Sequence, residues 1–237
     1  MIKRGKNYQD SIKLMDKTRE HSPEEAIVLA KKMACAKFDE TLELHLRMGL
    51  DPRNASQQVR GVALLPYGLG KAVRVLVFAQ GEGVRIAQSA GADYAGGDEL
   101  IKKIEDGWLE FDTTVATPDM MGKVGKLGKI LGRKGLMPNP KSGTVVPARD
   151  LPRVIEDARK GRVEFRLDRT AIIHVPLGKI SFDDDKLLAN LTTFVEAVVR
   201  AKPAGTKGHY VRSATITTTM GPGISLDLKT ALALSSA

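Results

Sequence analysis

Val73–Ala79, which reads VRVLVFA, is the stretch that decides the fold of this chain. It is mostly apolar and β-branched, as expected of a strand that is buried on both faces. The elements expected after it are, in order, a helix over residues 84–90, a strand at Ala92–Tyr94, a helix at Asp98–Asp106, a strand at Asp112–Ala116 and a helix at Asp150–Lys160. Strands that alternate with helices predict parallel βαβ units in this central region.

The segment before this region has a different sequence pattern, which is typical of amphipathic helices and strands with one apolar face. Ser22–Glu25 places a serine at the N-cap, a proline at the first helical position and a glutamate two residues later, which is a capping box that begins a helix. Thr41–Met48 alternates strictly between apolar and polar residues, as a strand with one buried face does. A second strand is expected at Arg60–Leu65.

The segment after the central region returns to the amphipathic style. Val163–Leu167 alternates, and we expect it to pair with Ala171–Leu177 as a hairpin. Asp183–Ala201 carries one apolar stripe that runs from Leu187 to Val199 and predicts the clearest helix of the chain. A threonine-rich strand is expected at Tyr210–Met220.

The amphipathic style at both ends predicts an α+β domain built from both termini, with an α/β domain inserted between its halves. We place the terminal domain at residues 1–67 and 160–237 and the inserted domain at residues 68–159. The two connections carry Gly68, Gly70 and Gly161. Two glycine-bearing connections that lie side by side are expected to form a hinge.

The composition is that of a basic protein. Lys and Arg number 37 against 28 Asp and Glu, so that the net charge is +9, and the isoelectric point near 9.6 favours a nucleic-acid partner. No run reaches the roughly 18 apolar residues that span a bilayer, and the basic start has no apolar segment behind it, so we expect no secretion signal and no membrane partner. Cys35 is the one cysteine, which excludes an internal disulfide, and we expect it to be a small buried residue.

The strongest charge feature is the basic run Gly122–Lys141, GKVGKLGKILGRKGLMPNPK. Its six cations are Lys123, Lys126, Lys129, Arg133, Lys134 and Lys141. Glycine disfavours a solvated helix by about 1 kcal/mol relative to alanine, so we do not expect an ordinary solvated basic helix here. Glycine also lets the backbone approach a surface closely, and the cations are counter-charges for phosphate. The run therefore favours a nucleic-acid contact over a mobile loop without a partner.

Several segments resemble catalytic or cofactor-binding motifs but lack residues that these motifs require. Gly81-Glu82-Gly83 follows a strand and opens a helix, but Ile86 stands where a dinucleotide fingerprint needs its third glycine. Gly68–Lys71 resembles a phosphate loop, yet Ala72 replaces the magnesium-binding hydroxyl and the strand follows the loop. The four histidines are scattered, so no metal site and no cofactor are expected. A nucleotide-dependent enzyme, resting on the βαβ pattern, and a DNA-binding regulator, resting on charge, stay as alternatives.

Thr217–Gly223, TTTMGPG, joins a threonine-rich strand end to a glycine-proline turn. Its hydroxyl groups, free amides and close backbone approach suit the sugars and phosphates of RNA. An edge strand that ends in a turn is the plain structural alternative.

The chain resembles the family of bacterial ribosomal protein L-one, the first-numbered protein of the large subunit. The segments that carry the resemblance follow each other in the right order over nearly the whole chain. They are Lys37–Thr41, Arg60-Gly61, Leu65–Lys71, Gly91–Tyr94, Ala116–Pro118, GRKGLMPNPK at Gly132–Lys141 and TTTMGP at Thr217–Pro222. Arg133 is a departure, because many members have proline there.

The resemblance implies a two-domain α/β protein without catalysis: a discontinuous α+β sandwich from both termini with an inserted, Rossmann-like, three-layer α/β domain. It implies a cytoplasmic, ribosome-bound protein, monomeric when free, that uses no small-molecule substrate. The implied partners are the mobile stalk of the large-subunit ribosomal RNA, the exit-site tRNA whose release the protein assists, and the protein's own operon mRNA, whose translation it represses.

The resemblance also implies which residues contact RNA. They are Lys37, Phe38 and Thr41 on one side, Ser213, Thr217, Thr219, Met220 and Gly221 on the other, and Asp168 and Arg169 as neighbours in a turn. Phe38 precedes a strand and can be exposed without breaking its alternation, although a core position is the alternative. The basic run lies in the inserted domain, and we expect it to form a secondary RNA or tRNA surface; the resemblance does not decide which RNA it contacts.

Overall fold

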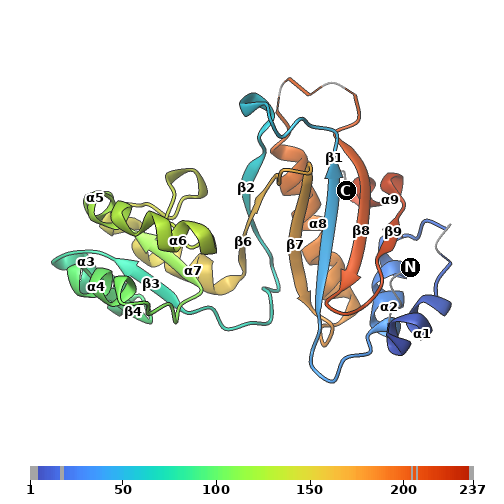
Figure 1. Ribbon diagram of the computed structural model, residues 1–237, viewed down its shortest axis with the longest axis horizontal. Helices are drawn as coiled ribbons and strands as arrows, with labels where there is room; N and C mark the ends of the chain where they lie inside the picture. Colours follow the sequence, from blue (N-terminus) through green and yellow to red (C-terminus); the bar gives the residue numbers. More distant parts are fainter. Residues whose placement is uncertain (1–4, 17–18, 204, 207, 235–237) are drawn as a thin grey trace. The chain divides into compact units, whose positions relative to one another are not determined.

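The computed structural model describes residues 5–16, 19–203, 205–206 and 208–234 (Figure 1). The chain divides into two compact units. The terminal unit comprises Met1–Gly70 and Val163–Ala237, and the inserted unit comprises Lys71–Arg162. The crossings predicted after residues 67 and 159 lie three residues before these divisions. The mixed α and β character expected from the sequence is confirmed.

The terminal unit is built on a four-stranded antiparallel sheet in the order β7-β1-β8-β9. Its strands are β1 (Thr41–Met48), β7 (Ile172–Lys179), β8 (Val211–Thr218) and β9 (Ile224–Leu226). The predicted alternation of β1 is confirmed, because Leu42, Leu44 and Leu46 are buried while the polar residues between them are not. One face of the sheet therefore carries the core and the other stays polar.

Helices cover the apolar face of this sheet (Figure 1). They are α2 (Pro23–Met33), α8 (Asp184–Arg200) and the short α9 (Leu228–Ala233), while α1 (Lys6–Lys13) lies beside α2. The predicted cap of α2 is confirmed, since the Ser22 hydroxyl accepts a hydrogen bond from the Glu25 N–H. Five residues of the α8 stripe are buried, namely Leu187, Leu191, Phe194, Val195 and Val198, and Leu188 is partly buried. The prediction for Val199 is wrong, because that side chain is 38% exposed.

A second, two-stranded sheet pairs β2 (Arg60–Leu64) with β6 (Arg162–Arg166). The predicted hairpin between the segments now seen as β6 and β7 is therefore wrong. Phe165 of β6 packs on Phe194 of α8 with ring centroids 5.3 Å apart, and a Cβ on Gly61 of β2 would lie 2.6 Å from the Phe165 ring. The missing side chain at Gly61 thus lets this aromatic ring enter the core and draws β6 to β2, while β7 pairs with β1.

The inserted unit has three layers around a parallel sheet in the order β4-β3-β5. The strands are β3 (Val75–Phe78), β4 (Tyr94–Gly96) and β5 (Thr113–Ala116). Burial of β3 on both faces is confirmed: Val75 and Val77 face one apolar cluster and Leu76 and Phe78 face the other. The strand predicted at Ala92–Tyr94 is displaced to β4, and the Asp93 carboxylate before it accepts the Val75 N–H at 2.8 Å.

Helices flank this parallel sheet on both sides. One apolar cluster contains residues of α3 (Glu82–Ser89) and α7 (Leu151–Lys160), and the other contains residues of α4 (Asp98–Glu105), α5 (Met121–Val124) and α6 (Gly128–Lys134). Short 3-10 turns complete the chain at η1 (Ala55–Gln57), η2 (Pro118–Met120), η3 (Gly125–Leu127), η4 (Pro140–Ser142) and η5 (Ala148–Asp150).

The glycines predicted to form a hinge all have positive φ angles, which are 66° at Gly68, 69° at Gly70 and 108° at Gly161, the C-cap of α7. The Gly68 carbonyl accepts a hydrogen bond from Asn190 Nδ2 at 3.0 Å, and the Tyr67 N–H donates to Asn190 Oδ1 at 3.1 Å. Asn190 is fully buried in α8. These bonds fix the first connection to the terminal unit as far as Gly68, and the hinge stays a prediction.

Candidate nucleic-acid interface

The buried carboxylate of Glu40 joins two loops that are distant in sequence. Its Oε1 accepts hydrogen bonds from the N–H groups of Cys35 at 3.1 Å and Ala36 at 2.9 Å, and its Oε2 accepts one from the Met220 N–H at 3.0 Å. Burial alone would raise the pKa of Glu40, but these backbone bonds and one from the Thr218 hydroxyl outweigh it and lower the pKa. Glu40 is thus an anionic clamp between the Lys37-Phe38 loop and the Met220 loop.

The Met220 loop is a tight turn that only glycine can close. The Gly221 N–H donates to the Thr218 hydroxyl at 3.0 Å, and a Cβ on Gly221 would lie 2.4 Å from that same oxygen. The Thr217 hydroxyl donates to the carbonyls of Thr218 and Gly221. The turn projects the Met220 side chain outward with 56% exposure.

Phe38 on the facing loop is equally exposed, at 56%, which agrees with its expected exposure and excludes the core alternative. We define the clamp surface as Lys37, Phe38, Thr219, Met220 and Gly221. The prediction that Cys35 is buried is wrong, because Cys35 is exposed at the edge of this surface.

Thr41 and Thr219 connect the clamp surface to the sheet. The Thr219 hydroxyl accepts the Thr41 N–H at 3.0 Å and lies 3.4 Å from the Thr41 carbonyl. Lys179 Nζ donates to the Thr41 hydroxyl at 2.9 Å and to the Asp39 carbonyl at 3.2 Å. Both threonine hydroxyls therefore already have partners within the chain, and they hold the loops in place.

The polar side of the antiparallel sheet extends the clamp surface. Directly paired residues of antiparallel strands point to the same face, and β1 pairs Glu43 with Thr217 and Arg47 with Ser213. We define the outer sheet face as Thr41, Glu43, His45, Arg47, His174, Ser213, Thr215 and Thr217. Glu43, His45, Arg47, His174 and Thr215 were missed by sequence reasoning, although the alternation of β1 already places three of them on its polar side.

Two histidines lie at the centre of the outer sheet face. His45 Nδ1 is 2.8 Å from His174 Nδ1, and the ring centroids are 4.9 Å apart. Glu43 lies 3.8 Å from His45 Nε2, and Asp168 lies 3.5 Å from His174 Nε2. Burial and the neighbouring His174 lower the pKa of His45, while Glu43 acts in the opposite direction. His45 is therefore a titratable group with a lowered pKa within a polar face.

The turn between β6 and β7 presents Arg169. Asp168 accepts hydrogen bonds from the N–H groups of Thr170 at 2.8 Å and Ile172 at 2.7 Å, so its carboxylate organises the turn. Ala171 has φ of 61°, which is a strained conformation for a residue with a side chain, and its carbonyl accepts the Met48 N–H. Asp168 shapes the loop, and exposed Arg169 is the group free to reach a partner.

The basic run of the inserted unit is helical as far as Lys134, contrary to the expectation from its glycines. Met120, Val124, Leu127 and Leu131 recur at helical spacing and are buried to 1% exposure or less. This stripe anchors α5, η3 and α6 on the core and overrides the low helix propensity of glycine. The glycines lie away from the core, since a Cβ on Gly122, Gly125, Gly128 or Gly132 would have no atom within 4 Å.

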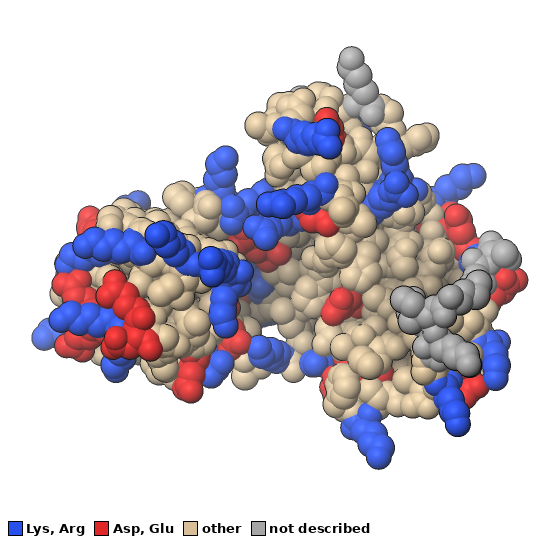
Figure 2. All heavy atoms as spheres, viewed as in Figure 1, with Lys and Arg blue, Asp and Glu red and all other residues tan. Residues whose placement is uncertain are grey.

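Cations occupy the same exposed side of the run. Figure 2 shows lysine and arginine side chains gathered over α5 and α6, whereas acidic side chains gather near α4. Among the described residues, Lys123 is the only cation of the run with an ion-pair partner, Asp98 at 2.8 Å. Lys126, Lys129, Arg133, Lys134 and Lys141 are exposed and available to a polyanion.

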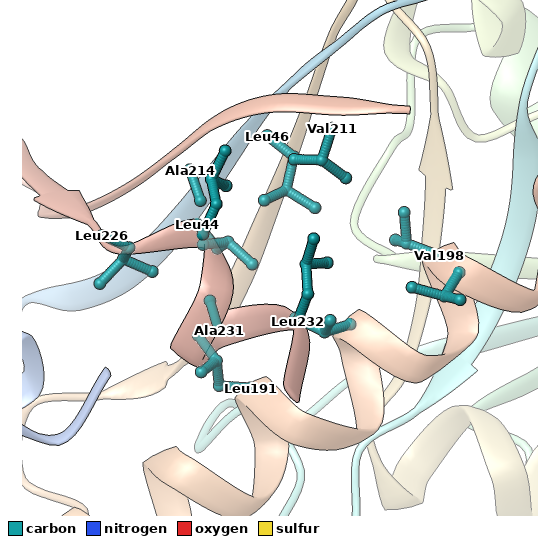
Figure 3. Close-up of a pocket in the computed structure, with 12 residues that line it drawn as sticks. Leu44, Leu46, Leu191, Val198, Val211, Ala214, Leu226, Ala231 and Leu232 are labelled. Atoms are coloured by element: carbon teal, nitrogen blue, oxygen red, sulfur yellow. The ribbon is translucent and has the colours of Figure 1, made fainter. Parts of the chain in front are cut away.

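The most enclosed apolar pocket of the described chain is too small for a ligand. The apolar pocket between α8, α9 and the sheet in Figure 3 holds about 10 Å³ and is lined by side chains such as Leu44, Leu191 and Leu232. A void of this size with no polar partner stays dry. The described residues also contain no group of three His, Cys, Asp or Glu side chains placed to bind a metal ion. None of the described helices is long and apolar enough to cross a membrane.

Comparison with known proteins gives consistent matches. The model of the Ribosomal protein L1p/L10e family matches residues 30–222. A "Large ribosomal subunit protein uL1" from Dehalococcoides mccartyi is 65% identical over 237 residues, which is 100% of both chains. The protein of the same description from Thermomicrobium roseum is 56% identical over 231 residues, covering 97% of this chain and 96% of that protein.

Proposed function

Because this chain belongs to the Ribosomal protein L1p/L10e family, we propose that it holds the ribosomal RNA of the mobile stalk through its terminal unit. Full-length identity of 65% with large-subunit proteins supports a structural, non-enzymatic protein of that subunit, bound to the ribosome in the cytoplasm. A nucleotide-dependent enzyme and a DNA-binding regulator thereby lose their support. The discontinuous α+β arrangement with a Rossmann-like insert belongs to the same proposal.

One observation carries the placement of the RNA. The Glu40 carboxylate brings the Lys37-Phe38 loop and the Met220 loop together, although 180 residues separate Glu40 from Met220. The result is an exposed aromatic ring, an exposed thioether and an unpaired lysine beside a hydroxyl-rich sheet face. Aromatic rings stack on unpaired bases, hydroxyl groups contact ribose, and lysine neutralises phosphate. Ser213, Thr217 and Arg169 extend this surface along the sheet and the β6–β7 turn.

The basic run serves a second RNA. Its five cations without ion-pair partners lie on the inserted unit, which carries none of the clamp surface. Exposed glycines on the same side let a phosphate backbone approach the helix closely. We assign this surface to exit-site tRNA, whose release it assists.

The protein's own operon mRNA is the third RNA partner. Repression of its translation requires that the mRNA occupy the same clamp surface as the ribosomal RNA. The two RNAs therefore compete for one site, and unlabelled stalk RNA should displace labelled operon mRNA completely. Simultaneous binding of both RNAs to one protein would contradict a shared site.

The main assignment is tested by binding of the full chain to an isolated stalk RNA fragment and to a scrambled hairpin of equal length. A double variant, Phe38→Ala with Met220→Ala, is expected to lose at least tenfold in affinity, since stacking on an aromatic side chain contributes about 1–3 kcal/mol per base. Val28→Ala is the matched control, because Val28 is an exposed apolar residue on α2 of the same unit. Equal affinity of the double variant and the control would reject the clamp surface as the binding site.

A further inference from the structure

An open cleft separates helix α1 from the clamp surface. Its volume is about 690 Å³. The start of α1 forms one wall, and the Cys35–Phe38 and Thr219–Gly221 segments form the other. Although the relatives align over the full chain, the family model begins to match at residue 30, after α1 has ended. None of the residues that the family resemblance assigns to RNA lies on α1.

Helix α1 is held firmly beside this cleft. The Ser11 hydroxyl, 5% exposed, donates a hydrogen bond to the Met33 carbonyl at 3.0 Å, which joins α1 to the last residue of α2. Met15, just beyond α1, packs on the core of the terminal unit. The two walls of the cleft thus belong to one packed unit, so that the binding site is preorganised for a ligand between them.

The cleft combines an apolar floor with positive charge. Phe38 and Met220 each expose 56% of their surface, and Tyr8 adds a second, half-buried aromatic ring. Lys6 lines the cleft and is exposed. The Glu40 carboxylate, which bonds the Cys35, Ala36 and Met220 N–H groups of the lining segments, is 1% exposed. Apolar rings beside a cation match an unpaired nucleobase with its adjoining phosphate.

We propose that this cleft binds one unpaired nucleotide of the stalk RNA, with its base on Phe38 and Met220 and its phosphate at Lys6. Its volume lies within the 300–1,000 Å³ range of sites for small ligands, which is enough for a nucleotide. The inference rests on the proposed function and adds α1 to the RNA-binding surface. Lys6, Asn7 and Tyr8 become contact residues, while Lys13, on the last turn of the same helix, does not.

Cys35 provides a direct probe of occupancy. It is the only cysteine of the chain, it is exposed and it lines the cleft. A saturating amount of stalk RNA fragment should slow the reaction of the full-length protein with a thiol reagent at least tenfold, and a scrambled hairpin should not. If the stalk RNA binds while Cys35 reacts at its free rate, the cleft is empty in the complex and the inference is wrong. If the stalk RNA does not bind at all, the proposed function itself fails.

A pair of lysine variants tests the phosphate contact. Lys6→Gln should weaken stalk-RNA binding about threefold to tenfold and reduce the slope of log affinity against log salt by about 0.7–0.9, the value for one phosphate contact. Lys13→Gln is the control, since Lys13 is exposed on the same helix and pairs with Asp10. Equal affinities and equal slopes for the two variants would overturn the role of Lys6.

Abasic substitution tests the base contact. One unpaired position of the RNA fragment should lose about tenfold in affinity for the natural protein when its base is removed. The Phe38→Leu variant should be insensitive to removal of that same base, because the stacking partner is already absent. If every abasic position affects the natural protein and Phe38→Leu equally, no base lies on Phe38.

Discussion

Glu40 accepts a hydrogen bond from the Met220 N–H at 3.0 Å, and this contact ties the start of β1 to the loop after β8. The contact has an electrostatic consequence. The hydrogen bonds to Glu40 keep its pKa low despite burial, so that the residue is charged at neutral pH. The Glu40 carboxylate can lie behind an RNA-binding surface because three backbone N–H groups stabilise its negative charge. The clamp surface in front of it is neutral or cationic.

Glu40→Gln should lower both stability and RNA affinity. A glutamine amide nitrogen would face N–H donors, and the loss of a buried charge-assisted hydrogen bond costs about 1–3 kcal/mol. Urea unfolding measures the loss, with Glu24→Gln as the control, because Glu24 is an exposed residue in the first turn of α2. Since the folded pKa of Glu40 lies below its usual 4.5, its contribution is complete above that pH and lost as the pH falls through the folded pKa. The variant should therefore show a flatter stability curve in this acid range, and an unchanged curve would refute the clamp.

Thr219→Val should loosen the Met220 loop without unfolding the protein. Valine keeps the shape and the β propensity, but it leaves the Thr41 N–H without the hydroxyl that it now donates to at 3.0 Å. We expect a loss of about 0.5–1.5 kcal/mol in unfolding free energy and a parallel loss of RNA affinity. Thr192→Val is the control, because Thr192 lies on α8, outside the clamp surface and the outer sheet face, and its hydroxyl bonds only the Leu188 carbonyl of the same helix. A Thr219→Val protein with normal stability but weak RNA binding would instead make the hydroxyl a direct RNA contact.

His45 predicts that the free energy of unfolding depends on pH near neutrality. His45 has a folded pKa below its usual 6.5, so the unfolded chain takes up the proton at higher pH than the folded protein. The stabilising contribution is complete above pH 6.5 and is lost as the pH falls through that value toward the folded pKa. The free energy of unfolding should decrease between pH 7.5 and 5.5, and His45→Gln should flatten this decrease. An equally steep decrease in the variant would place the titrating group elsewhere.

RNA binding should respond to the same histidine with the opposite sign. Protonation of His45 adds positive charge to the outer sheet face, beside Glu43. Phosphate near this face favours the protonated form, so that stalk-RNA affinity should rise as the pH falls toward 6, while stability declines. Parallel binding and unfolding titrations of the natural protein and His45→Gln separate the two effects. Identical pH profiles of binding would show that RNA does not reach His45.

Local patterns explain which parts of the fold were predictable. The strict alternation of Thr41–Met48 and the Ser22 cap act within a few residues, so the sequence alone identifies the strand and the helix start. The pairing of β6 with β2 depends on the fit of Phe165 over Gly61, which are distant in sequence. The helical basic run escaped prediction because its buried stripe outweighs the poor propensity of its glycines.

The sequence predicted those residues of the candidate site that the family resemblance assigns to RNA contacts. Phe38 and Met220 were expected at the RNA surface, and both are exposed. Glu40 was not, since nothing in its local pattern shows that its carboxylate will collect N–H groups from both loops. Cys35 was expected inside because it is a small apolar residue beside Met33 and Ala34, but helix α2 ends before it and it lines the cleft.

Replacement of a glycine in the basic run by alanine tests whether these glycines let RNA approach the helix closely. Gly132 lies inside α6, and an added Cβ there would meet no atom within 4 Å. Gly132→Ala should therefore raise the unfolding free energy by about 0.5–1 kcal/mol, because alanine is the better helix former. If a phosphate backbone approaches the helix at this point, the more stable variant should bind exit-site tRNA less well. A variant that is more stable and binds tRNA normally would leave these glycines without a role in close approach.

The cations of the basic run should act on tRNA and leave the stalk RNA to the clamp surface. Replacement of Lys126, Lys129, Arg133 and Lys134 by glutamine removes four exposed charges from the inserted unit, which carries none of the clamp surface. Screening limits exposed charges beyond about 8–10 Å, so stalk-RNA affinity should stay within about threefold at moderate salt. Release of deacylated tRNA from reconstituted ribosomes should slow. Each lost phosphate contact lowers the slope of log affinity against log salt concentration by about 0.7–0.9. If the slope for stalk RNA falls by about three in this variant, the four cations bind that RNA directly. The inserted unit would then be the main binding site for the stalk RNA.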